Sequence, residues 1–248
     1  MTYVISDIHG CYVKYMEMLR EINFGPEDML YVLGDVLDRG PDGFKILLDM
    51  ASRPNVVALR GNHEDMAIRA LPGILRCIVE GDMDAMTDEE AESMDLWFHN
   101  GGELSLADFL CLDNEQMQSA WEYMCAMPLY REVEVDNQKF VLLHGGLENF
   151  SPNRALEDYA PDEILWCRPK PDTVYYADKC VVVGHTPVQL LAGTKKPAKI
   201  YRKGNLIDID CGCVYRGGQL GCLCLDTLEE FYVTDRKNYS SPYQSYAV

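Results

Sequence analysis

Five short segments of the chain combine side chains that can bind metal ions with neighbouring glycines. The candidate ligands are all oxygen or imidazole donors: Asp7, His9, Asp35, Asn62, His144 and His185. Because the set contains no thiolate, it suits Mn, Fe, Zn or Co better than copper(I) or an iron–sulfur cluster. Six ligands exceed the needs of one tetrahedral zinc ion and fit two metals that share a bridging carboxylate. Two metals about 3.5–4 Å apart are a recurring device for in-line displacement at phosphorus.

Glycine flanks nearly every candidate ligand. The glycines in question are Gly10, Gly34, Gly40, Gly61, Gly145, Gly146 and Gly184. Sharp turns at strand ends often need a positive φ, and a backbone that closely approaches a bound anion leaves no room for a Cβ atom. The chain has five histidines, four of which lie in these segments. A single histidine after a strand is usually structural, but this coincidence favours a shared site.

Each segment follows an apolar run that is typical of a buried strand. The predicted strands are Tyr3–Ser6, Met29–Leu33, Val56–Leu59, Phe140–Leu143 and Cys180–Val183. Apolar residues at helical spacing predict helices over 12–22 and 43–51, which is the alternation of an α/β protein. In open α/β sheets the carboxyl ends of the strands line the crevice where ligands bind. We therefore expect the five segments to converge in space.

The remaining sequence differs in character from these strand–helix units. Residues from about 65 to 130 predict a helical insert, in which Thr87-Asp-Glu-Glu90 fits a capping box. Acidic residues gather between 80 and 95 without basic ones, which indicates a solvated face or, less simply, selection against anionic partners. Short hairpin strands are expected from about 199 to 234, and the polar tail from about 238 to 248 is expected to be loosely held. No repeat or linker divides the chain, so we predict a single domain over 1–248.

Charge and hydropathy exclude several classes of protein. The 22 Lys+Arg and 40 Asp+Glu residues give a formal net charge of −18. This excess of acid argues against nucleic-acid partners and against an anionic membrane surface. No stretch approaches the ~18 consecutive apolar residues of a membrane span. The N-terminus lacks the basic region of a signal peptide, so we expect a cytoplasmic protein, with no prediction of its oligomeric state.

A group of cysteines near the C-terminus leaves two interpretations open. Its members are Cys211, Cys213, Cys222 and Cys224. Four sulfurs close in sequence could bind zinc, although zinc sites usually separate paired cysteines by two residues. Small buried core residues are the favoured interpretation, because apolar runs at 206–209 and 221–225 predict a β-hairpin.

Five motifs appear along the chain in a characteristic order. They are Asp7-x-His9, Gly34-Asp-x-x-Asp-Arg-Gly40, Gly61-Asn-His-Glu64, His144-Gly-Gly146 and Gly184-His-Thr-Pro187. Together they resemble the calcineurin-like metallophosphoesterases, and the second and third resemble the bacterial and phage phosphoprotein phosphatases, such as that of phage lambda. The resemblance covers 3 to about 225 and is least diagnostic over 66–130. It implies an α/β/β/α sandwich of two mixed sheets flanked by helices, with a helical insert.

The resemblance also implies two divalent metal ions as cofactors, with Mn first and Fe, Zn, Co or Ni as alternatives. One metal would be held by Asp7, His9 and Asp35, and the second by Asp35, Asn62, His144 and His185. Asp35 would bridge the two. Metals so placed lower the pKa of a shared water and give a hydroxide that attacks phosphorus in line.

Further roles carry over from the same motifs. Arg39 would bind the phosphoryl group together with Arg168, which follows Leu-Trp as the family's second arginine does. Arg154 is the other arginine between the last two histidine motifs. His63 would be the general acid, and Asp38 the carboxylate that pairs with it.

The resemblance suggests two activities. The first is hydrolysis of phosphoric monoesters by a serine/threonine or dual-specificity protein phosphatase acting on a phosphorylated protein. The second is a symmetrical bis(5'-nucleosyl)-tetraphosphatase, whose family also opens with the residue types of 7–12 but lacks the Asp38 equivalent and ends its third motif in Asp rather than Glu64. These two residues favour the protein phosphatase over a nucleotide substrate. A metal-binding scaffold without catalysis is disfavoured, because every motif position is filled.

One further element lies in the insert. Trp97-x-x-Asn-Gly-Gly102 also occurs in the bacterial relatives, where it belongs to the part of the insert near the site. We interpret it as a structural turn in preference to a substrate-facing loop, and His99 within it is outside the ligand set.

Overall fold

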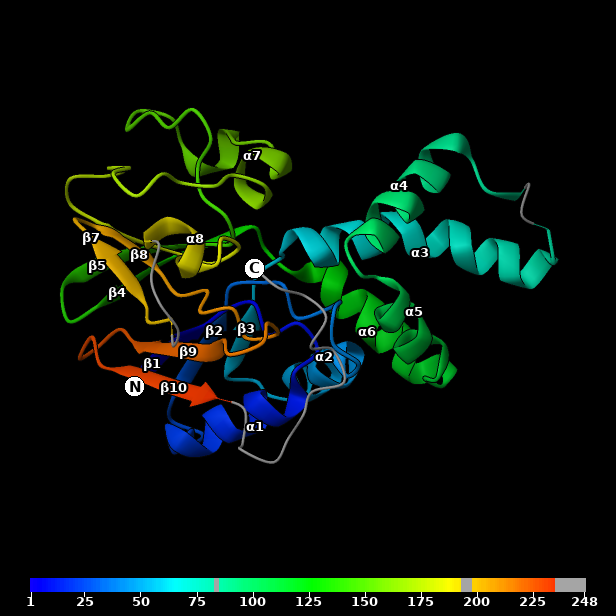
Figure 1. Ribbon diagram of the computed structural model, residues 1–248, viewed down its shortest axis with the longest axis horizontal. Helices are drawn as coiled ribbons and strands as arrows, with labels where there is room; N and C mark the ends of the chain where they lie inside the picture. The colour runs from blue at the N-terminus through cyan, green and yellow to red at the C-terminus, as the bar shows by residue number, and fades with distance from the viewer. Residues whose placement is uncertain (83–84, 193–197, 235–248) are drawn as a thin grey trace.

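Two five-stranded sheets pack face to face between helices in the computed structural model, which describes residues 1–82, 85–192 and 198–234 (Figure 1). The predicted α/β/β/α sandwich of two mixed sheets is therefore confirmed. The predicted tail at 238–248 lies outside the described residues. No helix in the described part of the chain is long and apolar enough to cross a membrane.

The first sheet has the strand order β10-β9-β1-β2-β3. Its strands are β1 (Thr2–Ile5), β2 (Met29–Val32), β3 (Val56–Ala58), β9 (Gln219–Cys224) and β10 (Glu230–Thr234). β1, β2 and β3 run parallel, whereas β9 pairs antiparallel with both β1 and β10. The carboxyl ends of the three parallel strands consequently lie at one edge.

The second sheet has the order β4-β5-β6-β8-β7. Its strands are β4 (Tyr130–Val135), β5 (Gln138–Leu143), β6 (Cys180–Val183), β7 (Tyr201–Lys203) and β8 (Leu206–Asp208). β5, β6 and β8 are parallel, and the two outer strands are antiparallel to their neighbours. All five strands predicted from apolar runs are present.

Alternate residues of the central strands enter different cores, because side chains on a strand point to opposite faces in turn. Val4 and Val182 belong to the core shared by the two sheets. Ile5 instead enters the core under the helices of the first sheet, and Val183 the outer core of the second. Burial on both faces explains why these strands are apolar throughout.

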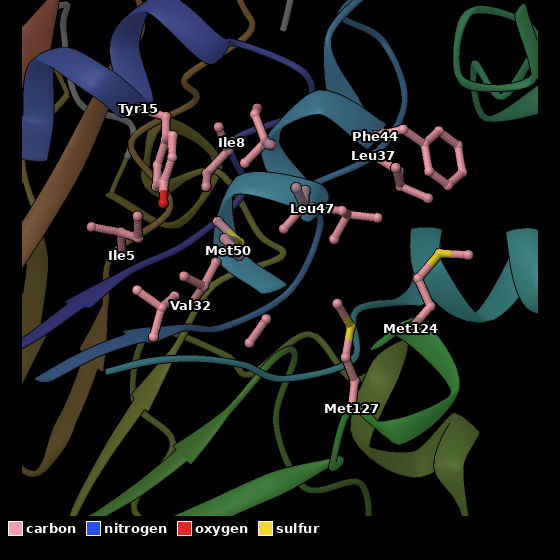
Figure 2. Close-up of a cluster of buried hydrophobic side chains, with 14 of the residues drawn as sticks. Ile5, Ile8, Tyr15, Val32, Leu37, Phe44, Leu47, Met50, Met124 and Met127 are labelled. Carbon is pink, nitrogen blue, oxygen red and sulfur yellow. The ribbon is translucent and has the colours of Figure 1, made fainter. Parts of the chain in front are cut away.

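Helices α1 (Tyr12–Glu21) and α2 (Gly43–Ala51) cover the outer face of the first sheet, and α2 has the predicted bounds. Figure 2 shows part of this core, where Ile5 and Val32 of the strands face the side chains of the helices. Met124 and Met127, from the end of the insert, close the far side of the same cluster.

The expected insert consists of four helices that extend away from the sheets (Figure 1). They are α3 (Asn62–Glu80), α4 (Asp88–His99), α5 (Glu103–Leu110) and α6 (Asn114–Ala126). The capping box at Thr87 is present. The Thr87 hydroxyl accepts from the backbone N–H of Glu90, and the backbone N–H of Thr87 donates to the Glu90 carboxylate. α5 and α6 pack on α2, which joins the insert to the first sheet.

The prediction that 206–209 and 221–225 pair as a hairpin is wrong. β8 lies in the second sheet and β9 in the first, so each pairs with the strand next to it in sequence. A turn at Gly204 joins β7 to β8, and such short connections favour local pairing. Of the four grouped cysteines, Cys213, Cys222 and Cys224 are buried in the core under α1 and α2, whereas Cys211 is buried between the sheets.

The remaining described elements are short. They are the 3₁₀ helix at Leu156–Asp158, α7 (Pro161–Leu165) and α8 (Val188–Ala192). They lie on the second-sheet side of the molecule, and α8 follows directly after His185-Thr-Pro187.

Candidate metal centre and phosphoryl site

The carboxyl ends of β1, β2, β3, β5 and β6 meet at one edge of the sandwich and bring the five motifs together. Each predicted ligand follows its strand by one to four residues, and all six are buried. Hydrogen bonds tie the segments to one another: the Asp7 N–H donates to Gly34 O and the Gly184 N–H donates to His144 O. The expected convergence is confirmed.

The backbone at this edge is strained. Six predicted site residues have a left-handed φ between 48° and 69°: Asp7, His9, Asp35, Asp38, Arg39 and His185. Non-glycine residues seldom adopt this region, and such residues cluster at functional sites. The glycines serve close approach as well. A Cβ on Gly61 would collide with Asp35, and one on Gly184 would collide with the carboxylate of Asp7.

Asp35 stands between two groups of candidate ligands. The ligand atoms of His9, Asp35 and His63 lie within 4.8 Å of one another, and so do those of Asp35, His144 and His185. Asp35 Oδ2 is 3.7 Å from His9 Nε2, whereas its Oδ1 is 3.3 Å from His144 Nε2. Its two oxygens thus face different groups, a position from which the carboxylate could bridge two metals.

Hydrogen bonds fix the tautomers of two histidines for metal binding. His9 Nδ1 donates to Leu37 O at 2.8 Å, and His144 Nδ1 donates to Leu33 O at 2.7 Å. The Nε2 atom of each ring therefore carries a lone pair. His144 Nε2 lies 2.8 Å from Asn62 Oδ1, so two acceptors face each other, which is the arrangement of atoms that share a cation.

The electrostatics of the centre also suit a cation. Burial lowers the pKa of His9, His144 and His185, which keeps the imidazoles neutral as metal ligands must be. Burial, followed by the nearby carboxylates, raises the pKa of Asp35 well above its usual range. His185 Nε2 is buried without a hydrogen-bond partner among the described residues. The donor set and this unpartnered nitrogen fit divalent metal ions.

Asp7 and Asn62 complete the predicted ligand set in different ways. Asn62 contacts His144 directly, as described above. Asp7 belongs to neither group of close ligand atoms, but its Oδ2 accepts from the N–H of His185, a member of the second group, at 2.9 Å and contacts the hydroxyl of Ser6. The third member of the first group is His63, which the motif pattern does not assign as a ligand.

The two residues predicted to act in proton donation lie in direct contact. His63 Nδ1 and Asp38 Oδ2 are 2.5 Å apart, and both side chains are fully buried. Burial raises the pKa of Asp38 to about 7 and lowers that of His63 well below its ordinary value. His63 Nε2 is directed toward the metal centre, 3.0 Å from the guanidinium of Arg39.

Of the two arginines that the sequence allows beside Arg39, only Arg168 faces the centre. It donates to His185 O at 3.2 Å and lines a cavity of about 510 Å³. Arg154 instead forms a two-pronged ion pair with Glu163, at 2.8 and 2.6 Å, and stacks on Tyr159. Arg39, from the motif that follows β2, lines the same cavity.

The cavity contains residues that sequence reasoning did not assign. Its lining comprises Asp35, Arg39, Asn62, Asn100, Trp166, Arg168, His185, Thr186, Pro187, Leu190 and Tyr215. Tyr215 accepts a hydrogen bond from Arg39 through its hydroxyl, and Trp166 packs edge-on against His185. The glycine-rich turn after β8 was the signal that could have identified Tyr215.

Two other buried acids escaped the sequence analysis. Asp208 and Asp210 follow one another in alternation with isoleucine, and burial raises the pKa of both well above the usual range. Asp210 accepts from the Gly212 N–H at 2.9 Å and so shapes the turn that carries Tyr215. An acid at the end of the apolar strand β8 and a second acid two residues later were the available signal.

Glu64 has a structural role that its motif did not reveal. Its Oε1 accepts from the N–H groups of Val36 and Leu37, and its Oε2 from those of Asp35 and Gly61. These four bonds clamp the loop after β2 to the start of α3, and thereby fix the backbone of the bridging aspartate. Burial raises the pKa of Glu64, and the amide donors counter that shift.

Comparison with known proteins agrees with this geometry. The model of the calcineurin-like phosphoesterases matches residues 2–221. The chain belongs to this family. Calcineurin-like phosphoesterases depend on a dinuclear metal centre, and the two His/Asp groups around Asp35 are residues that could bind it. The chain is accordingly a hydrolase of the metallophosphoesterase type.

Curated relatives in the calcineurin-like phosphoesterase family carry two kinds of name. Serine/threonine-protein phosphatase 1 of Salmonella typhimurium is 29% identical over 224 residues, with 88% of each chain covered. The symmetrical bis(5'-nucleosyl)-tetraphosphatase of Pectobacterium carotovorum is 30% identical over 138 residues, covering 54% of this chain and 49% of its own.

Solved structures agree on the fold. A protein provisionally named a diadenosine tetraphosphatase has a TM-score of 0.66 at 17% identity, with 96% of this chain and 94% of that chain covered. A protein serine/threonine phosphatase from Saccharomyces cerevisiae has a TM-score of 0.58 at 16% identity, with 96% and 81% covered.

Proposed function

We propose that the chain is a serine/threonine or dual-specificity protein phosphatase, which hydrolyses phosphoric monoesters with two divalent metal ions. The observation that carries this proposal is the buried pair of Asp38 and His63 beside the metal centre. The alkoxide of serine or threonine is a poor leaving group, so its departure needs a proton donor. A phosphoanhydride has a better leaving group and needs such a donor less.

The metal ions would be bound by the strand-end residues. One would be held by Asp7, His9 and Asp35, and the other by Asp35, Asn62, His144 and His185, with Mn²⁺ as the first choice. When bound, the ions would lower the pKa of a water molecule and so supply a nucleophile near neutral pH.

The two arginines that face the cavity would bind the phosphoryl group. Arg39 and Arg168 approach the centre from the loop after β2 and from the segment after α7. Guanidinium groups bind phosphoryl oxygens through paired hydrogen bonds and stabilise the charge that they carry in the transition state. Arg39 also contacts the Nε2 atoms of His9 and His63, at 2.8 and 3.0 Å.

His63 would donate the proton to the leaving oxygen, for which its ring must be protonated. Burial and Arg39, which donates to Nε2, oppose that state, whereas an ionised Asp38 beside Nδ1 favours it. The Nδ1 of His63 is held by Asp38, which leaves Nε2 to face the substrate. General acid catalysis of this kind contributes about 10²–10⁴ in rate. The insert and the sheets would work as one domain over 1–248, because Asn100 of the insert lines the same cavity as the strand-end residues.

A symmetrical bis(5'-nucleosyl)-tetraphosphatase is the second candidate. Trp166 and Tyr215 give the cavity an aromatic wall on which a nucleobase could stack. Curated relatives with this name match between 25% and 90% of the present chain, the latter at 26% identity.

The test is a comparison of kcat/KM for a phosphothreonine peptide and for diadenosine tetraphosphate, with protein reloaded with Mn²⁺. A preference for the peptide of at least tenfold is expected. The matched control is Asp35→Asn, which removes the bridging carboxylate and is expected to abolish both activities. A clear preference for the dinucleotide would overturn the protein-phosphatase proposal and leave the metal centre intact.

A further inference from the structure

The element Trp97–Gly102 of the insert contacts the acid–base pair directly. Trp97 is completely buried, and its indole N–H donates to both carboxylate oxygens of Asp38, at 3.0 and 2.9 Å. One of these oxygens, Oδ2, is also the partner of His63. The insert therefore supplies hydrogen bonds, from Trp97 and also from the side chain of Ser105, to the carboxylate that orients the proposed proton donor.

The same part of the insert also contacts the strained backbone of the loop after β2, which carries Asp38 and Arg39. Asp38 and Arg39 both have a left-handed φ, of 69° and 66°. The Asp38 N–H donates to Ser105 Oγ at 2.8 Å, and the Arg39 N–H donates to Gly101 O at 3.2 Å. Because such a conformation persists only when the surroundings enforce it, these contacts explain how the loop keeps its shape.

The spacing of the element follows from these contacts. A Cβ on Gly102 would lie 2.6–2.7 Å from three ring atoms of Trp97, so only glycine allows the turn to pass beneath the indole. Gly101 has a φ of 97° and lies against the side chain of Arg39. The tryptophan and the two glycines thus form one unit, which places an N–H donor under Asp38 and a carbonyl beside Arg39.

We propose that Trp97 is a positioning residue for proton donation to the leaving group. Its indole N–H fixes the Asp38 carboxylate in the plane that holds His63 Nδ1, and this keeps Nε2 of the ring directed into the cavity. The inference rests on the proposed function, because it assumes that His63 is the general acid. It assigns the helical insert a part in catalysis rather than in folding alone.

The experiment compares substrates that differ in their need for a proton. In Trp97→Phe the ring remains and the N–H donor is lost. We expect kcat for a phosphothreonine peptide to fall by about tenfold or more, within the range of a general acid, while kcat for 4-nitrophenyl phosphate changes by less than about twofold. KM for both substrates should stay unchanged. Trp121→Phe, which makes the same change on α6, is the matched control and should affect neither.

A second replacement guards against misfolding. Exchange of Trp97 for 3-benzothienylalanine puts sulfur in place of the indole N–H and preserves the shape of the ring. It should give the same selective loss. An equal loss on both substrates, or no loss on either, would show that Trp97 acts only in packing and would overturn the inference.

The variant His63→Asn separates this inference from the function on which it rests. It should itself show the selective loss, and adding Trp97→Phe to it should have no further effect on the ratio of the two kcat values. If His63→Asn slows both substrates equally, the general-acid proposal fails and the inference fails with it. If His63→Asn is selective and Trp97→Phe is not, only the role of Trp97 is refuted.

Discussion

The clamp made by Glu64 gives the sharpest prediction of stability. In Glu64→Gln the side chain keeps its shape, but an NH₂ group replaces one carboxylate oxygen and cannot accept a hydrogen bond. Each oxygen serves two backbone donors, Val36 with Leu37 and Asp35 with Gly61. Whichever way the amide is turned, two of the four N–H groups lose their acceptor.

The magnitude follows from this count of donors. A buried donor left without an acceptor costs about 1–3 kcal/mol, so two cost about 2–6 kcal/mol. Part of this loss is offset, because the substitution also removes a charge whose burial is unfavourable. We expect a net loss of at least about 2 kcal/mol, a large share of the roughly 5–15 kcal/mol that stabilises a typical folded protein.

The assay is urea unfolding of the metal-free protein, followed by far-ultraviolet circular dichroism. Glu92→Gln makes the same chemical change at an exposed position on α4 and should stay within about 0.5 kcal/mol of the wild type. Calorimetric titration with Mn²⁺ should show weaker binding in Glu64→Gln, because the backbone of Asp35 loses part of its support. A loss below about 1 kcal/mol with unchanged Mn²⁺ affinity would refute the reasoning.

Three further predictions concern pH, packing and salt. Burial raises the pKa of Tyr15, whose hydroxyl donates to Asp49 at 2.9 Å. The stabilisation by this phenol is complete below the unfolded pKa of about 10 and is lost as the pH rises toward the higher folded pKa. The difference in the free energy of unfolding between wild type and Tyr15→Phe should therefore shrink by about 1.4 kcal/mol per pH unit above 10. A difference that stays constant from pH 9 to 11.5 in urea unfolding would contradict this prediction. Gly184→Ala places a methyl group against the carboxylate of Asp7, so it should lower the free energy of unfolding by about 1–3 kcal/mol and weaken Mn²⁺ binding. The control is Gly25→Ala, whose Cβ would meet nothing closer than 3.7 Å and which should change neither quantity. Equal effects of the two variants would refute the predicted collision. Because the chain carries a formal charge of −18, added KCl should leave kcat/KM for an acidic phosphopeptide level or raise it, and a steep fall would show that attraction rather than repulsion dominates its approach.

The parts of the fold that depend on local pattern could be predicted from the sequence. The five apolar strands are buried on both faces, so hydrophobicity alone marks them, and α2 has the expected bounds because its apolar spacing is regular. The pairing of β8 and β9 could not be predicted in this way. Both are short apolar runs, and the choice between two sheets depends on partners far away in the sequence.

The candidate site divides along the same line. The motifs located the candidate ligands and the pair of Asp38 and His63, because each lies at a recognisable strand end. They favoured Arg168 as the second arginine by its place after Leu-Trp, and the ion pair of Arg154 with Glu163 shows that the other arginine is engaged elsewhere. The contact of Trp97 with Asp38 joins residues 59 positions apart, and no local pattern encodes such a contact.

The left-handed backbone of six site residues has a consequence for how this chain can change by mutation. A non-glycine residue in that conformation destabilises the fold by roughly 1 kcal/mol. The six residues together therefore carry a conformational free-energy cost comparable with the whole free energy of unfolding of a small protein. Glycine at any of them would relax the loop while removing a functional group. Under selection for thermal stability alone, glycine or asparagine should therefore accumulate at these positions. The resulting protein would be more stable but inactive. A survey of thermostable but inactive descendants would show which functional groups most oppose the stability of the fold.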